Sequence, residues 1–202
     1  MALKNHALDA KILAAARTEF LENGYKDSSL RKIAAQAGVT VGAIYTRYAT
    51  KDALFTALVQ PLLDRVALGF SMIQESYYGG GREPEHIAKA MDMESQTILH
   101  LLFDDYEAAV LLLCRSAGSS LEGFFDQLVE EKIRESEIFF TAAGVGQPDE
   151  RVLRLLIDGQ FHMYVQIIRD GYDLASAQEL MKTAMVYHTG GWMTLLRQEK
   201  GE

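Results

Sequence analysis

Residues 29–51, SLRKIAAQAGVTVGAIYTRYATK, predict two short helices joined by a tight turn. Ser29 can cap the first helix, because its hydroxyl can accept a hydrogen bond from a backbone N–H that lacks a helical partner. Gly38 can end that helix in the left-handed conformation, which glycine adopts without Cβ strain. Thr40 can then cap the second helix, and Ile44 can pack back onto the first. This spacing is typical of a helix-turn-helix.

The second helix of this pair has small and polar residues where a hairpin inside a protein core would have bulky ones. Val41, Gly42 and Ala43 are small enough for close approach to another surface, and hydroxyls and cations flank them. Small groups at base edges, with hydroxyls and cations at phosphates, suit the major groove of DNA. The alternative is an ordinary helical hairpin within an all-α core. The composition of the second helix favours DNA binding.

Residues 8–55 resemble the DNA-binding domain of the TetR family of bacterial transcriptional regulators. The resemblance rests on FLENGY at 20–25, IAxxAGV at 33–39 and IYxxYxxKDxLF at 44–55. Tyr48 departs from it, because the family more often has phenylalanine there. The resemblance implies an all-α fold, with an N-terminal three-helix helix-turn-helix domain followed by a helical bundle. It also implies a homodimeric transcriptional regulator that acts in the cytoplasm.

A set of side chains on the two short helices is expected to contact double-stranded DNA. Ser29 and Arg31 would contact the DNA backbone at the start of the first helix. The base edges would meet Thr40, Val41, Gly42, Ala43 and Thr46. The family resemblance assigns phosphate contacts to Tyr45, Tyr48 and Lys51. Because a two-fold symmetric pair of such helices matches a two-fold symmetric sequence, the expected target is a palindromic operator.

The composition is that of a soluble protein with one large or two small domains. Of 202 residues, 49% are hydrophobic and 24% are charged, which allows a substantial core. The single cysteine, Cys114, excludes an internal disulfide framework and fits a reducing cytoplasm. The sequence shows neither a signal peptide nor an uncharged apolar stretch of about 18 residues, so no membrane segment is expected.

The net charge of −8 is distributed unevenly along the chain. Residues 1–52 hold eight Lys or Arg and five Asp or Glu, whereas the rest of the chain holds 12 basic and 23 acidic residues. Because residues 1–52 are basic and the rest of the chain is acidic, the N-terminal segment is the part attracted to the phosphates of DNA. We call this segment the DNA-binding head and the rest of the chain the acidic body. We therefore expect a DNA-binding domain at residues 1–52 and an effector-binding and dimerisation domain at residues 53–202.

Helical periodicity and its breaks divide the chain into nine expected helices, without a strand or an internal repeat. The first covers residues 8–23 and is closed by Gly24. After the two short helices, Thr50 caps a fourth helix, in which Pro61 would bend the rod. The remaining five are expected near residues 84–104, 106–116, 120–142, 149–170 and 174–197.

The last two of these helices carry a candidate dimer interface. They are long, joined by a tight turn, and hold glycine and alanine where two backbones could approach closely. The predicted interface residues are Leu155, Gly159, Met163, Leu180, Ala184, Tyr187, Gly191, Trp192 and Leu195. The family resemblance implies that this helix pair docks on its copy as a four-helix bundle. The alternative is a monomeric end-piece of the core.

Motifs of the common catalytic classes are missing from the sequence. It lacks His-Glu-x-x-His, a phosphate-binding glycine loop before Lys-Ser/Thr, and Gly-x-Ser-x-Gly. The five histidines are scattered and show no zinc-binding spacing. Cys114 lies in an apolar run, where a core thiol is commoner than a nucleophile. We therefore expect neither an enzyme nor a metal or other cofactor.

A small-molecule site within the middle helices is expected instead, because regulators of this family usually hold an effector there. The candidate ligand-binding residues are Met91, Gln96, His100, Phe103, Tyr106, Arg115, Phe124, Phe125 and Tyr164. For any single one of them, plain core is the commoner role. Arg115 and His100 are the more telling, because a charge among apolar neighbours needs a partner, either a nearby carboxylate or an anionic effector.

Together these features predict a sequence-specific DNA-binding transcriptional regulator, a repressor that a small-molecule effector releases from its operator. The first alternative is a small-molecule-binding helical protein or an enzyme that keeps a vestigial DNA-binding head. The second is an adaptor that binds a partner protein through its acidic body.

Overall fold

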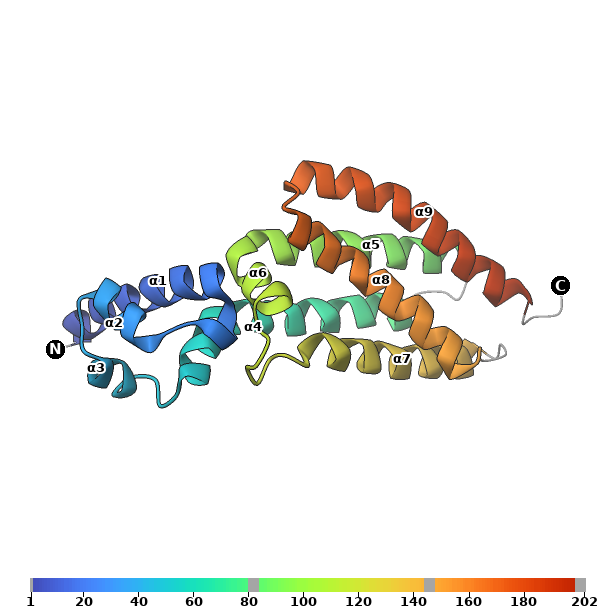
Figure 1. Ribbon diagram of the computed structural model, residues 1–202. Coiled ribbons are helices and arrows are strands. Elements are labelled where there is room, and N and C mark those ends of the chain that lie inside the picture. The colour runs from blue at the N-terminus through green and yellow to red at the C-terminus, as the bar shows by residue number, and fades with distance from the viewer. Residues whose placement is uncertain (1, 80–83, 144–147, 199–202) are drawn as a thin grey trace. The chain divides into compact units, whose positions relative to one another are not determined.

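The computed structural model describes residues 2–79, 84–143 and 148–198, and these residues form nine α-helices and no strand (Figure 1). This confirms the predicted all-α fold. In chain order the helices are α1 (Ala2–Asp27), α2 (Leu30–Ala37), α3 (Val41–Tyr45), α4 (Lys51–Gly79), α5 (Pro84–Asp104), α6 (Tyr106–Cys114), α7 (Phe124–Ala143), α8 (Glu150–Asp170) and α9 (Leu174–Gln198).

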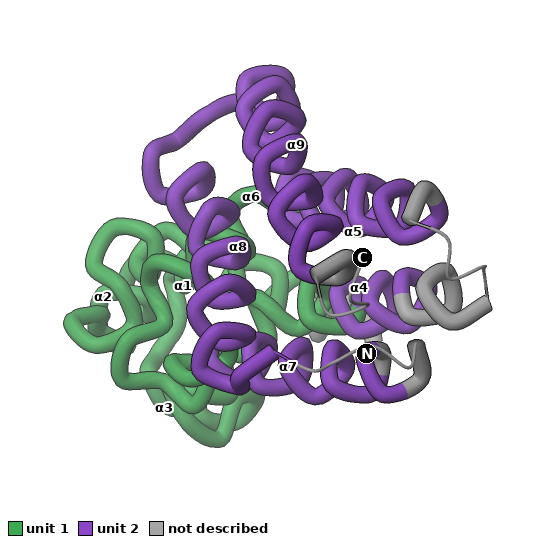
Figure 2. Tube along the Cα trace, turned by 90° about the vertical axis from the view of Figure 1, so that its right-hand side faces the viewer, with its two compact units in different colours: residues 1–64, 105–124 green, residues 65–104, 125–202 purple. Residues whose placement is uncertain are grey.

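The chain packs as two compact units, which are coloured separately in Figure 2. The first unit consists of residues 1–64 and 105–124, and the second consists of residues 65–104 and 125–202. The first unit therefore contains the helix-turn-helix together with α6 and the loop that follows it. These units are defined by packing. The functional boundary between residues 52 and 53 stays a prediction.

The core of the first unit is made by five helices, α1, α2, α3, α4 and α6. Its fully or almost fully buried side chains include Ile12, Ala16, Phe20, Ile33, Ala34, Ile44, Leu54, Phe55, Leu58, Ala108 and Leu111. The rings of Phe20 and Phe55 meet edge to face with their centroids 5.1 Å apart, an arrangement that stabilises beyond simple burial. This core holds the helix-turn-helix against α1, α4 and α6.

Three local signals of the helix-turn-helix region are confirmed. Gly38 follows α2 with φ 69° and ψ 35°, the left-handed conformation. The hydroxyl of Thr40 accepts a hydrogen bond from the backbone N–H of Ala43 at 3.1 Å. The hydroxyl of Thr50 caps α4 by accepting from the N–H of Ala53 at 2.9 Å. The turn and the two helix starts are therefore encoded by the residues at those places.

The predicted capping role of the Ser29 hydroxyl is wrong, because that hydroxyl makes no capping hydrogen bond. Glu19 of α1 supplies the acceptor instead: its buried carboxylate accepts the backbone N–H of Ser29 at 3.0 Å. A carboxylate at the start of α2 also suits the positive end of that helix. The contact ties α1 to α2 and fixes where α2 begins.

The second unit contains residues 65–79 of α4 together with α5, α7 from residue 125 onward, α8 and α9. α4 and α5 approach closely at Gly69, where an added Cβ would lie 2.7 Å from Leu101 Cδ1, so a larger residue would force Leu101 to move. The most deeply buried side chains of this unit include Leu99, Val129, Ile133, Leu153, Ile157, Ile168 and Met181. They form the helical core of this unit.

Residues Lys51–Ile73 of α4 are long and apolar enough to cross a membrane by length and composition alone. The core helix of a soluble protein passes the same test. Asp64 and Arg65 interrupt the stretch, and both Leu54 and Phe55 are fully buried in the core of the first unit. Because these two side chains are buried inside the protein, this part of α4 packs as a core helix.

Candidate nucleic-acid interface and ligand site

The side of α3 that is predicted to meet base edges is accessible. Gly42 and Thr46 are exposed, and Val41 and Ala43 are half-buried. A Cβ built on Gly42 would meet only Thr40 Oγ1, at 3.8 Å, so the surface in front of it is open. The structure thus places the predicted base-edge residues on one short helix and its two flanks. Their contact with DNA stays a prediction.

The residues predicted to contact phosphates differ in how far they are exposed. Arg31 and Tyr45 are exposed, whereas Ser29 and Tyr48 are half-buried. Burial raises the pKa of the Tyr48 phenol, and the nearby carboxylate of Asp9 raises it further. The phenol therefore stays protonated at neutral pH and can donate a hydrogen bond to a phosphate oxygen.

The ammonium group of Lys51 makes its contacts within the first unit. Its Nζ donates to the carbonyl oxygen of Ser28 at 2.9 Å and to that of Lys26 at 3.3 Å, and it lies 4.6 Å from the centre of the Tyr25 ring. Burial lowers the pKa of Lys51. Carbonyls at the end of a helix lack intrahelical donors, so this ammonium ties the end of α1 to the start of α4. A phosphate at Lys51 would share the ammonium with these carbonyls.

An ion pair that the sequence analysis missed joins α1 to the residues after α3. Arg47 Nε donates to the carboxylate of Asp9. Arg47 Nη1 lies 3.5 Å from the carbonyl oxygen of Ala43, at the limit of a hydrogen bond. The guanidinium therefore links α1 to the backbone of α3, and this contact restricts how α3 can tilt.

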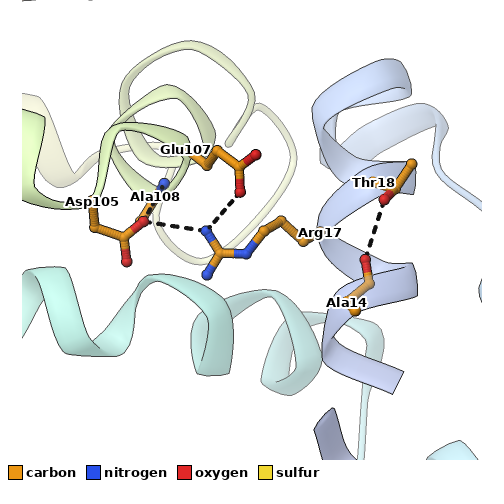
Figure 3. Close-up of polar contacts among 6 residues, drawn as sticks. All are labelled: Ala14, Arg17, Thr18, Asp105, Glu107 and Ala108. Atoms are coloured by element: carbon orange, nitrogen blue, oxygen red, sulfur yellow. Dashed lines mark hydrogen bonds and ion pairs between the residues drawn. The ribbon is translucent and has the colours of Figure 1, made fainter. Parts of the chain in front are cut away.

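Residues 105–124 are linked to α1 by polar contacts that the sequence analysis also missed. Arg17 of α1 points toward the start of α6, where its Nη1 lies 3.2 Å from Asp105 Oδ1 and 3.3 Å from Glu107 Oε2 (Figure 3). Asp105 also caps α6, because its side chain accepts the N–H of Ala108 at 3.2 Å. One carboxylate thus starts α6 and contacts α1 at the same time.

Two further contacts extend this attachment along the loop after α6. The backbone N–H of Tyr25 donates to the carbonyl oxygen of Arg115 at 2.8 Å. Asp52, in the first turn of α4, accepts both the N–H and the hydroxyl of Ser120. Because these partners lie far apart in the sequence, no local pattern announces them.

The nine predicted ligand-binding residues are divided between the two units. Met91, Gln96, His100, Phe103, Phe125 and Tyr164 belong to the second unit, and Tyr106, Arg115 and Phe124 belong to the first. His100 and Arg115 are both exposed. The expectation that Arg115 carries a charge among apolar neighbours is therefore wrong, because the residue follows α6 at the surface. A ligand role for these residues stays a prediction.

The buried polar groups of the second unit lie elsewhere. Glu94 is 2%, Ser95 0% and Tyr164 2% exposed. Lys132 of α7 forms an ion pair with Glu94 at 2.6 Å. The hydroxyls of Ser95 and Tyr164 are buried without a hydrogen-bond partner, and each such group costs about 1–3 kcal/mol unless something satisfies it. The signal was present in the sequence, because positions 94 and 95 lie on the same helical face as the buried Met91 and Ile98.

Gln160, His188 and Trp192 form a second polar group in this unit. Trp192 Nε1 donates to His188 Nε2 at 2.8 Å, and Gln160 Oε1 lies 2.8 Å from the same nitrogen. Because the indole N–H can only donate, its bond to His188 requires a lone pair on Nε2 and a neutral ring, and a nitrogen in that state cannot also donate to Gln160 Oε1. Burial lowers the pKa of His188, although the nearby Glu94 opposes the shift.

Groups of three or more His, Cys, Asp or Glu side chains that could hold a metal ion are not found within residues 2–79, 84–143 and 148–198. Cys114 is a half-buried thiol.

The predicted dimer interface includes exposed apolar side chains on α8 and α9. Leu155 is 75% and Tyr187 is 87% exposed, and Leu180 is also exposed. A Cβ on Gly159 or Gly191 would meet no atom within 4 Å, so the backbone is open there. Such an apolar surface is typical of an interaction site. Dimerisation through it stays a prediction.

Comparison with known sequences finds a family match within the first unit. The family described as "Bacterial regulatory proteins, tetR family" matches residues 12–58, which cover most of α1, all of α2 and α3, and the start of α4. By this match, residues 12–58 resemble the N-terminal domain of TetR-family regulators. The HTH-type transcriptional regulator YdgC of Bacillus subtilis (strain 168) is 28% identical over 96 residues. The matched region spans 47% of each chain, about half the length of that relative.

Solved structures share the fold of this chain over most of its length. NalD, the secondary repressor of the MexAB-OprM multidrug efflux pump in Pseudomonas aeruginosa, has a TM-score of 0.58 and 23% identity, and the match covers 92% of this chain and 96% of NalD. AibR in complex with isovaleryl coenzyme A and operator DNA has a TM-score of 0.59 and 18% identity, with 86% and 95% covered. At these identities the likeness establishes the fold.

Proposed function

We propose that this protein is a homodimeric, sequence-specific DNA-binding transcriptional regulator of the TetR family that represses transcription from a palindromic operator. The proposal is carried by the open, small-residue face of α3, which the Thr40 cap and the Arg47–Asp9 pair hold in place. Such a helix can approach base edges closely in the major groove. The relatives support this function, because YdgC is named a transcriptional regulator and AibR was crystallised with operator DNA.

A small-molecule effector releases the protein from its operator in this proposal. The structure of AibR with an acyl coenzyme A supports an effector-binding role for the matching helices. α4 contributes residues to both compact units, so one continuous helix can carry a change from the second unit to the helix-turn-helix. The protein acts in the cytoplasm, where the DNA is, and it is a regulator and not an enzyme.

The test is a fluorescence-anisotropy titration of the full chain against duplexes that tile the DNA upstream of its own gene, repeated across salt concentrations. We expect tight binding to one duplex, with two chains per site and an affinity that falls steeply with salt. Weak binding of equal strength to every duplex would contradict sequence-specific recognition.

Two matched variants locate the contact. Gly42→Glu places a carboxylate on the open face of α3, and Gly123→Glu places the same group in the same unit, at a site where a Cβ meets nothing within 4 Å. Carboxylates repel DNA, so Gly42→Glu should lower operator affinity by at least about 100-fold, or about 2.7 kcal/mol. Gly123→Glu should bind like the wild type. Equal losses in both variants would show that α3 does not make the contact.

A second candidate function is a small-molecule-binding protein with a vestigial DNA-binding head. It is favoured by the buried and unsatisfied hydroxyls of Ser95 and Tyr164 in the second unit. Ligand binding together with uniformly weak DNA binding would establish this alternative.

A further inference from the structure

Three helices of the second unit bring polar side chains together in its interior. Glu94 and Ser95 come from α5, Lys132 comes from α7 and Tyr164 comes from α8. Lys132 Nζ lies 2.6 Å from Glu94 Oε1. Tyr164 is close to both residues of α5, because the Ser95 hydroxyl and the Glu94 charge both act on its phenol. We refer to Glu94, Ser95, Lys132 and Tyr164 as the inner polar cluster.

The inner polar cluster contains two hydroxyls that the protein leaves unsatisfied. Neither Ser95 Oγ nor Tyr164 Oη makes a hydrogen bond of good geometry among the described residues, although the Ser95 hydroxyl lies close enough to the phenol to lower the pKa of Tyr164. Both side chains are almost completely buried. Nearly all buried polar groups in folded proteins are hydrogen-bonded to protein, water or a ligand. Burial raises the pKa of Tyr164 far above its ordinary value, so the phenol is neutral and can accept or donate a hydrogen bond. The two hydroxyls therefore point to a bound polar group.

The charge around the cluster favours a positive group. Lys132 lies 3.7 Å from Glu135 as well as 2.6 Å from Glu94, so two carboxylates share one ammonium. Burial raises the pKa of Glu135, and repulsion from Glu94 and Glu131 adds to the shift although Lys132 opposes it. The second unit as a whole has more acidic than basic residues. A further cation is stabilised in such a field, and an anion is repelled.

An aromatic group adjoins the cluster. The ring of Phe161 has the rings of Phe70, Phe125 and Tyr164 around it, with centroid distances of 6.4, 6.2 and 6.2 Å. Aromatic rings offer apolar contact, and their faces attract organic cations. Tyr164 belongs to both groups, so a molecule with a charged head at the cluster can place an apolar body against these rings.

We propose that the inner polar cluster binds the ammonium head of an organic amine, whose N–H groups donate to the hydroxyls of Ser95 and Tyr164 while Glu94 supplies the counter-charge. The inference rests on the proposed function, because the amine would be the effector that releases the operator. Arg65 points to an anionic ligand instead, since its Nε and Nη2 are buried without a partner. Arg65 is only half-buried, however, and one cation does not outweigh the acidic surroundings.

The test compares three probes that share one apolar body and differ only in the head: 4-phenylbutylamine, 4-phenylbutanol and 4-phenylbutyrate. Binding to the full-length protein is measured by calorimetry and by the emission of Trp192, the only tryptophan. We expect the amine to bind at least tenfold more tightly than the alcohol, and the carboxylate to bind most weakly. A carboxylate that binds as tightly as the amine would overturn the proposal and favour an anionic effector.

Variants that keep the Glu94–Lys132 pair intact locate the amine. Tyr164→Phe removes an unsatisfied hydroxyl, so it should weaken amine binding about tenfold without lowering the melting temperature of the free protein. Tyr172→Phe, an exposed tyrosine of the same unit, is the matched control and should bind normally. Glu135→Gln should weaken the amine severalfold and strengthen the carboxylate. Unchanged amine binding in both Tyr164→Phe and Glu135→Gln would overturn the site.

Operator binding of the same samples separates this inference from the proposed function. Specific operator binding without amine binding overturns the amine site and leaves the repressor intact. Amine binding that Tyr164→Phe weakens, together with equal and weak binding to every duplex, supports the amine site and overturns the repressor.

Discussion

Asp52 accepts two hydrogen bonds from Ser120, one from the backbone N–H at 2.8 Å and one from the hydroxyl at 2.7 Å. Asp52 lies in the first turn of α4, where a carboxylate also suits the positive end of the helix. Ser120 lies in the loop between α6 and α7, 68 residues later. Hydrogen bonds to a charged acceptor are stronger than neutral ones. The pair therefore fastens this loop to the helix that follows the helix-turn-helix.

Breaking this pair should destabilise the first unit. We expect Asp52→Ala to lower the free energy of unfolding by about 1–2 kcal/mol and Ser120→Ala by about 1 kcal/mol. The double variant should lose about 0.5–1 kcal/mol less unfolding free energy than the two single variants lose together, because both changes remove the same hydroxyl contact. Urea denaturation measures all three values.

Asp126 provides the control for the helix-dipole part of the effect, because it also lies in the first turn of a helix. Asp126→Ala should lower the free energy of unfolding by about 0.5 kcal/mol. This loss should add fully to the loss caused by Ser120→Ala. Full additivity of Asp52→Ala and Ser120→Ala would show that the pair contributes nothing to stability.

Lys51 should behave as a structural residue as much as a DNA contact. Lys51→Met keeps the alkyl chain but removes the ammonium that holds the carbonyls of Lys26 and Ser28. We expect a loss of about 1 kcal/mol in unfolding free energy. We also expect weaker binding to all DNA, with a smaller change in salt dependence than an exposed phosphate contact would give. Denaturation and salt-dependent anisotropy measure the two effects.

Arg31→Met is the comparison, because Arg31 is exposed and is predicted to contact the DNA backbone. Loss of one phosphate contact reduces the slope of log affinity against log salt by about one. Arg31→Met should therefore change the slope more than Lys51→Met does. A full unit of slope lost in Lys51→Met with no loss of stability would contradict the structural role.

The parts of the fold that sequence could predict are those whose cause is local. Gly38 and Thr40 act on residues within one turn of themselves, so their roles could be read from spacing alone. The cap of α2 could not be predicted from spacing, because its acceptor is Glu19 on another helix. The same holds for Arg17 with Asp105, whose meeting depends on which helices pack together.

The candidate ligand residues also show what neighbours in the sequence cannot predict, which is whether a side chain is buried. The apolar residues beside Arg115 in the sequence predict a buried charge, yet its position just after α6 leaves Arg115 exposed. Glu94 and Ser95 are the buried polar residues, and their helical spacing from Met91 and Ile98 marks them as inward-facing. Periodicity is therefore the better guide to a buried charge, because a helix turns neighbouring residues to different sides.

His188 should make the stability of the second unit depend on pH. Burial lowers its folded-state pKa below the ordinary value of 6.5. At pH values between the folded-state and unfolded-state pKa of His188, the unfolded chain binds more protons than the folded one. The contribution of the neutral His188 to the free energy of unfolding is therefore complete above about pH 6.5 and decreases as the pH falls below that value. Protonation also removes the lone pair that accepts the Trp192 N–H. We expect His188→Gln to flatten the stability curve between about pH 7 and pH 5.

Urea denaturation at half-unit pH steps measures this difference. His100→Gln is the control, because His100 is an exposed histidine of the same unit. The control should keep the wild-type slope of unfolding free energy against pH. A wild-type slope in His188→Gln as well would assign the pH dependence to other groups.

The exposed apolar side chains of α8 and α9 should hold two chains together. Tyr187 and Leu155 are among the most exposed large apolar residues described, and the open backbone at Gly159 and Gly191 allows close approach of a second helix pair. A carboxylate at either side chain would have to be buried without a partner in a dimer. Tyr187→Glu and Leu155→Glu should therefore sediment as monomers at concentrations where the wild type is a dimer.

Leu68→Glu makes the matched change at an exposed leucine of α4, outside the predicted interface. It should stay dimeric, because its side chain is predicted to face water in both states. The monomeric variants should also lose operator affinity by far more than they lose stability, since two heads that bind together have a high effective concentration for the second half-site. Dimers in all three variants would place the interface on another surface. Monomers that keep full operator affinity would show that one head is sufficient for recognition.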